Sequence, residues 1–180
     1  MAIASPPLCE SRRTTDCIGR PHRERVSPGK RNFILKVTMD LVHPPIWRRI
    51  LVPADIKLSR LHTVIQIVTG ATDSIQHFFI DSQRTIYANP AWEDLPKIKS
   101  GRDVGLATIL SRPGDRLAYY CGDDDEWEHT VELLKITEVV SRSDRAACLA
   151  GDQACLRRDA RHRGKFLLSA VNRALQRLRV

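Results

Sequence analysis

Residues 58–70 have the sequence LSRLHTVIQIVTG, which carries the clearest secondary-structure signal in the chain. Apolar residues recur at i, i+3, i+7 and i+10, and such spacing places them on one face of an α-helix. This stripe consists of Leu58, Leu61, Ile65 and Val68. Gly70 follows the last of them, and glycine readily takes the left-handed conformation that ends many helices. The pattern predicts a helix over residues 58–69 that packs its apolar stripe on another element.

Short apolar segments flank this helix on both sides. The first is NFILKVTM at residues 32–39, where every second residue is apolar, as in a strand that buries one face. Pro44-Pro45 interrupts the chain before the next apolar segment, so the first two strands are expected to pair antiparallel. The predicted strands are residues 32–39, 46–52, 77–80, 85–88, 115–121 and 127–139, with a loop over 89–103 and a short helix or turn over 104–110. This order predicts an α+β fold: a roll-like, β-grasp-like mixed sheet with one main helix packed across it, plus a C-terminal helix.

The net charge of +8 is concentrated at the two ends of the chain. Residues 1–30 contain six Lys and Arg against three Asp and Glu, and residues 141–180 contain ten against three. The segment between them, residues 31–140, is slightly acidic, with 13 basic and 15 acidic residues. We therefore expect a disordered basic N-terminal segment, an α+β domain over 31–140, and a basic C-terminal segment over 141–180.

A second helical pattern lies within the basic C-terminal segment. Its apolar residues recur at i, i+4, i+7 and i+11, and they are Leu167, Val171, Ala174 and Leu178. This spacing predicts an amphipathic helix over residues 164–178. The helix is expected to dock loosely, so that deleting residues 156–180 would cost only about 1–2 kcal/mol of stability.

Composition excludes several classes of protein. No apolar run approaches the length that a membrane-spanning helix needs, so no membrane partner is expected. The first residues lack the apolar stretch of a secretory signal. Five cysteines at irregular spacing do not form a disulfide framework. Together these features predict a soluble protein of the reducing cytoplasm.

Four segments carry a pattern that goes beyond composition. They are PPIWRR with LVPADI at residues 44–56, LHTVIQ at 61–66, TDS with a following His77 and Phe79 at 72–79, and GDD with WEH at 122–129. In this order and spacing they resemble the plasmid pRiA4b ORF-3-like family, also described as a passenger protein of an insertion element, over about residues 32–156. The resemblance implies a compact α+β domain found on plasmids, mobile elements and bacterial chromosomes, and it implies no established reaction.

This chain departs from the family pattern in three places. Ile75-Gln76-His77 stands where the family has His-Leu-His, and the segment Tyr120–Trp127 is altered and lengthened. After the cysteine segment, residues 148–155, an arginine-rich stretch replaces the expected prolines and glycines. A change of reading frame or a replaced end is our hypothesis for that switch.

The acidic run at residues 123–126 is the best candidate for chemistry. Hard cations such as Mg²⁺ take carboxylate ligands, and histidines on neighbouring strands would complete a site. The candidate cluster consists of His77, Asp123, Asp124, Trp127 and His129. Strand alternation places Trp127 and His129 on one face and Glu128 on the other. The alternative is a solvated hairpin turn without chemistry, and we assign no metal site here.

A second candidate is a nucleic-acid contact. Trp47 lies beside two arginines, and aromatic stacking combined with cationic side chains is typical of single-strand binding. The candidate contacts are Arg48, Arg49, Arg157, Arg158, Arg161 and Arg163. The alternative is that the tryptophan packs in the core and the arginines pair with acids.

These observations favour an uncharacterised, plasmid- or mobile-element-associated protein that acts as a non-catalytic binding or accessory module, with an unknown protein partner and no cofactor. One alternative is a metal-dependent enzyme that uses His77 and the acidic hairpin. The other is a nucleic-acid-binding protein that uses the basic ends of the chain, chiefly the arginine-rich C-terminal end. An enzyme would need its polar side chains to converge on a pocket.

Overall fold

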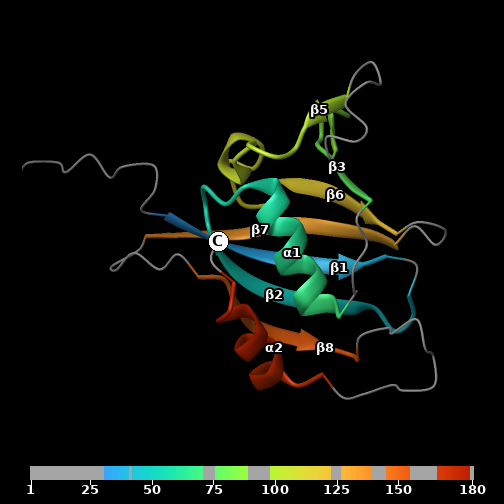
Figure 1. Cartoon of the computed structure of the whole chain (residues 1–180), viewed down its shortest axis with the longest axis vertical. Helices are drawn as coiled ribbons and strands as arrows, with labels where there is room; N and C mark the ends of the chain where they lie inside the picture. Colours follow the sequence, from blue (N-terminus) through green and yellow to red (C-terminus); the bar gives the residue numbers. More distant parts are fainter. Residues whose placement is uncertain are drawn as a thin grey trace, which may run out of the picture.

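The computed structural model describes residues 31–40, 42–70, 76–88, 98–122, 127–138, 145–154 and 166–178. Within them, eight strands form one sheet in the order β5-β4-β3-β6-β7-β1-β2-β8 (Figure 1). Neighbouring strands are antiparallel except β4 and β5, which are parallel. The strands are β1 Arg31–Met39, β2 Ile46–Pro53, β3 His77–Ile80, β4 Ile86–Ala88, β5 Ile98–Ser100, β6 Arg116–Cys121, β7 Trp127–Glu138 and β8 Ala147–Asp152. The predicted α+β mixed sheet is confirmed.

Helix α1, Leu58–Thr69, crosses one face of this sheet (Figure 1). Its buried residues include the four of the predicted stripe together with Val64. Burying a side chain of this kind stabilises a fold by about 1.5–3 kcal/mol, so the stripe is the main reason why the helix forms. Gly70 has a φ of 73° and donates its N–H to the Gln66 carbonyl at 2.8 Å, which confirms the predicted left-handed cap.

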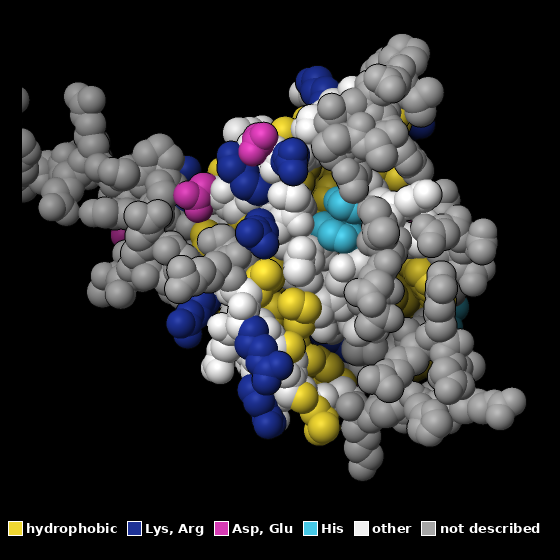
Figure 2. Space-filling view, in the orientation of Figure 1, with side chains coloured by type: hydrophobic (Ala, Val, Ile, Leu, Met, Phe, Trp, Pro, Cys, Tyr) yellow, Lys and Arg dark blue, Asp and Glu magenta, His cyan; other side chains and the backbone are white. Residues whose placement is uncertain are grey.

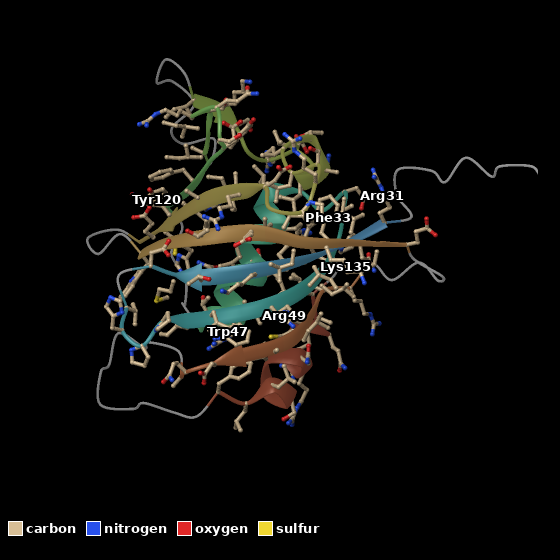
Figure 3. All side chains as sticks on the ribbon, turned by 180° about the vertical axis from the view of Figure 1, so that it is seen from behind. Arg31, Phe33, Trp47, Arg49, Tyr120 and Lys135 are labelled. Carbon is tan, nitrogen blue, oxygen red and sulfur yellow. The ribbon has the colours of Figure 1, made fainter. Side chains whose placement is uncertain are left out.

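The strands bury alternate residues against α1. On β1 the buried residues are Phe33, Leu35, Val37 and Met39, as the alternation predicts. Within the described ranges, no helix covers the opposite face of the sheet (Figure 3). Arg49 on β2 is exposed on that open face. A side chain directly beneath α1 is therefore covered by the helix, whereas Arg49 on the open face is accessible.

Two strands lie where none was predicted. β5 falls within the expected loop over 89–103 and pairs parallel to β4. β8 falls within the basic C-terminal segment and pairs antiparallel with β2. Its sequence, ACLAGD, is short, contains glycine and does not alternate strictly, so only the pairing with β2 defines it as a strand. The sheet therefore extends beyond residue 140.

The C-terminal helix α2, Leu168–Leu175, is shorter than the predicted 164–178. The predicted stripe is rotated, because Leu167 and Ala174 are exposed while Leu175 is completely buried. The Asn172 side chain accepts the Cys148 N–H at 2.8 Å and donates to the Cys148 carbonyl at 2.9 Å. It thereby takes the place of a neighbouring strand at one residue of the edge of β8, a specific contact that the sequence did not predict.

Other predictions concern residues outside the described ranges. The disordered N-terminal segment, residues 1–30, is one of them, and the acidic run at 123–126 is another. Neither α1 nor α2, the helices of the described part, has the length and apolar character needed to cross a bilayer.

Candidate functional site

The sheet register places polar and aromatic side chains together beneath the first half of α1. His77 on β3 aligns with Cys121 on β6, and Cys121 aligns with Trp127 on β7. In the next row, Phe79, Tyr119 and His129 align across the same three strands. The structure therefore brings three of the predicted cluster residues, His77, Trp127 and His129, to one face at one end of the sheet.

A pair of stacked histidines covers this part of the sheet. The His62 and His77 rings lie parallel, with centroids 3.6 Å apart and an interplanar angle of 10°. We call this pair the histidine stack; histidine side chains are visible on the α1 face in Figure 2. His62 Nδ1 lies 2.7 Å from the Tyr119 hydroxyl, a hydrogen bond that joins α1 to β6. His62 is not among the cluster residues predicted from the sequence, although its position four residues after Leu58 places it beside the buried stripe.

His129 is the innermost member of the cluster. It is completely buried, and its ring centroid lies 5.3 Å from that of Tyr119. Its Nδ1 lies 3.1 Å from the Trp127 carbonyl, while its buried Nε2 has no hydrogen-bond partner among the described residues. The rings of both His77 and His129 lie near that of Tyr119, with centroids 6.5 Å and 5.3 Å from it.

Burial disfavours the charged forms of four side chains here, those of His62, Tyr119, Cys121 and His129. Desolvation, together with repulsion from His77, lowers the pKa of His62 to about 3. Desolvation also lowers the pKa of His129, and it raises the pKa of the Tyr119 phenol and that of the Cys121 thiol. The groups are therefore suited to donating and accepting hydrogen bonds rather than to holding an ion pair.

A pocket opens beside the histidine stack, between α1 and the β3–β4–β5 end of the sheet. Its volume is about 120 Å³, and it is lined by Leu58, Ser59, His77, Phe79, Tyr87, Ala88, Gly101 and Arg102. Most of the wall is apolar, and the polar side chains are those of Ser59, His77, Tyr87 and Arg102. We call this the α1–β3 pocket.

Arg48 has a different role from the predicted one. Its side chain is completely buried, and its guanidinium donates to the carbonyls of Val68, Trp47, Asp152 and Gln153 at 2.6–3.0 Å. A group held in this way is not accessible to a nucleic acid, so the expected contact is not supported for Arg48. Arg49 is exposed and Trp47 half-buried, both on the open face (Figure 3).

Several candidate residues lie outside the described ranges. They are Asp123, Asp124, Arg157, Arg158, Arg161 and Arg163. Among the residues that the structure does describe, no group of three or more His, Cys, Asp or Glu side chains is arranged to hold a metal ion.

The lowered pKa of His62 predicts that the stability of the protein depends on pH. The folded-state pKa of His62 is lowered, so below about pH 6.5 the unfolded chain binds a proton that the folded protein does not. We expect the free energy of unfolding to be level above pH 7.5 and to fall between pH 6.5 and 4.5, by at most about 1.4 kcal/mol per pH unit for each such histidine. Partial exposure of His62 reduces this slope.

Urea titrations across this range measure the slope. His62→Gln should flatten it, whereas His43→Gln, at an exposed histidine remote in sequence, should leave it unchanged. An identical slope in the wild type and in His62→Gln would show that His62 is not held neutral by the fold.

Comparisons with known proteins agree with this architecture. The model of the family described as "Plasmid pRiA4b ORF-3-like protein" matches residues 31–167, a longer stretch than the 32–156 expected from the resemblance. The uncharacterized protein y4hQ of Sinorhizobium fredii is 36% identical over 103 residues, or 55% of this chain and 51% of that relative, so the chain spans about half the relative's length.

A solved structure is similar as well. The protein of unknown function MM3350 from Methanosarcina mazei Go1 superposes with a TM-score of 0.62 at 24% identity, covering 72% of this chain and 74% of that one. At this identity the likeness concerns the fold alone.

Proposed function

This chain belongs to the plasmid pRiA4b ORF-3-like family, and from that premise we propose that it is a non-catalytic binding module whose ligand site is the α1–β3 pocket. The relatives that it matches are described as uncharacterised or of unknown function. The proposal therefore rests on the geometry of this chain.

The proposal is based on the pocket beside the histidine stack. Binding sites for small molecules are concave and mostly apolar, with a few polar groups that orient the ligand, and groups of perturbed pKa often lie beside them. The α1–β3 pocket has these properties, because apolar walls surround His77, whose ring stacks on the strongly perturbed His62.

The size of the pocket limits the ligand. An apolar cavity of about 150 Å³ binds benzene in a well-studied case. The α1–β3 pocket, at about 120 Å³, is of similar size. It would therefore take one small ring or a branched aliphatic group, with the rest of the ligand directed to the exposed side chain of Arg102.

A titration with small aromatic fragments tests this function. Benzamide and benzoate, followed by amide NMR on the full chain, should shift the signals of Ser59, Phe79 and Gly101 in a saturable manner. Gly101→Leu should abolish binding, because a side chain at this lining position would extend into the pocket. A Cβ at Gly101 would meet its neighbours at 3.4 Å or more, so the variant is expected to fold.

Gly105→Leu is the matched control. Gly105 is close in sequence but does not line the pocket, and a Cβ there would lie 3.7 Å from the Asp55 carbonyl oxygen. This variant should bind both fragments as the wild type does. The absence of saturable shifts with either fragment, or equal binding by Gly101→Leu, would contradict the proposed site.

We also propose a cytoplasmic location, supported by the buried thiol of Cys121, which forms no disulfide among the described residues. The metal-dependent and nucleic-acid-binding alternatives remain proposals, and most of their key residues lie outside the described ranges.

A further inference from the structure

We infer that the ligand of the α1–β3 pocket is a small carboxylate whose apolar part enters the pocket and whose anionic group binds Arg102. This inference rests on the proposed function and names the class of ligand.

The described part of the pocket lining is positively charged, and the inference is based on this charge. Among the described residues of its lining, the titratable side chains include a permanent cation, Arg102, and no carboxylate. Arginine offers a planar fork of N–H donors that matches the two oxygens of a carboxylate. The phenol of Tyr87 keeps its proton, because desolvation and the hydrogen bond to Asp81 raise its pKa. The described lining therefore contains no anion that would repel a bound carboxylate.

The backbone that presents Arg102 is fixed on both sides of the pocket. The Ser59 hydroxyl donates to the Arg102 carbonyl at 3.1 Å, which joins the first turn of α1 to this segment. Gly101 donates its N–H to the Ala88 carbonyl at 2.9 Å, which joins the same segment to β4. The Arg102 side chain itself is exposed, so a ligand would not have to displace a buried contact.

The first turn of α1, beside the pocket, is also positively charged. Lys57 and Arg60 lie in the turn of α1 that contains Leu58 and Ser59, and this first turn contains no acidic residue. Of the described acidic residues nearby, Asp55 and Asp103 are exposed to solvent, where their charges are screened. The Asp81 carboxylate accepts the Tyr87 hydroxyl at 3.1 Å and does not itself line the pocket. Lys57 also donates to the Asp103 carbonyl at 2.6 Å, which holds this cation near the rim.

The test compares two probes of equal shape. Benzoate and benzamide differ in charge and hardly at all in size, so the ratio of their dissociation constants isolates the anionic group. With the full chain at pH 7.5 and low salt, we expect benzoate to bind about tenfold more tightly, because hydrogen bonds to a charged group exceed neutral ones by roughly 1.4 kcal/mol. Arg102→Gln should reduce the ratio to near one while benzamide affinity stays unchanged.

Arg112→Gln is the matched control, since it removes the same charge from an exposed arginine that does not line the pocket. It should keep the tenfold ratio. Equal binding of the two probes by the wild type would overturn the carboxylate inference and leave the binding function intact. An unchanged ratio in Arg102→Gln would also overturn it, whereas binding of neither probe would remove the proposed function itself.

Discussion

Replacing Arg48 by leucine is expected to destabilise the protein by about 3–5 kcal/mol, a loss typical of broken buried polar networks. The guanidinium donates Nε–H to the Val68 carbonyl at 2.7 Å, at the end of α1. It also donates to the carbonyls of Asp152 at 2.6 Å and Gln153 at 3.0 Å, at the end of β8. One side chain thus joins the helix, β2 and the last strand, and leucine would leave several buried carbonyls without a donor.

Close packing around Arg48 adds to the expected effect. Its guanidinium carbon lies 4.1 Å from the centre of the Phe166 ring, a cation–π contact with the segment before α2. A Cβ at Gly151 would lie 2.7 Å from Arg48 Cδ and 3.0 Å from the Trp47 carbonyl oxygen, so only glycine fits beside this side chain. The site has little room to rearrange after the substitution.

Denaturant unfolding of three variants measures the effect. Arg48→Leu should lose most, and Arg48→Lys should fall between Arg48→Leu and the wild type because an ammonium keeps the charge but cannot donate in the same fork. Arg49→Leu is the control, because this neighbour is exposed on the open face. If Arg48→Leu and Arg49→Leu unfold at the same midpoint, Arg48 does not join these elements.

Ending the chain after residue 165 is expected to cost about 4 kcal/mol or more, well above the 1–2 kcal/mol expected from the sequence. Removal of a buried leucine side chain alone costs about 2–5 kcal/mol, and Leu175 is completely buried in the core. The truncation would also remove both hydrogen bonds from Asn172 to Cys148 and the Phe166 ring from Arg48.

The truncation should also change the solution behaviour of the protein. Without Asn172, the N–H and carbonyl of Cys148 on β8 would lose these two hydrogen bonds, and strand edges that lose their covering partners pair readily with other chains. We therefore expect a lower unfolding midpoint and a shift toward larger species in size-exclusion chromatography. A truncated protein that is monomeric and unfolds at the wild-type midpoint would show that α2 is not part of the fold.

Single substitutions separate the loss of stability from the tendency to associate. Leu175→Ala should lower stability without promoting association, because it empties a core position and leaves Asn172 in place. Leu168→Ala is the matched control on the same helix, since Leu168 is 39% exposed. It should leave both the midpoint and the elution volume nearly unchanged.

Local sequence patterns predict correctly those elements that depend only on neighbouring residues. The apolar stripe of α1, its glycine cap and the alternation of β1 follow from neighbours within a few residues, and the structure has all three as predicted. Alternation also placed Trp127 and His129 on one face, which the register with β6 confirms. The resemblance to a family added the fold, because its motifs lie along these same elements.

Contacts between residues far apart in the sequence depend on the tertiary fold and could not be predicted. β8 has a weak pattern of its own, and it becomes a strand because β2 offers an unpaired edge. The face that α2 buries depends on the position of Cys148, which its Asn172 side chain binds. His62 and Tyr119 are 57 residues apart and are brought together by the crossing of α1 over β6. Periodicity describes one element at a time, whereas these contacts depend on how separate elements pack, and no local pattern encodes that packing.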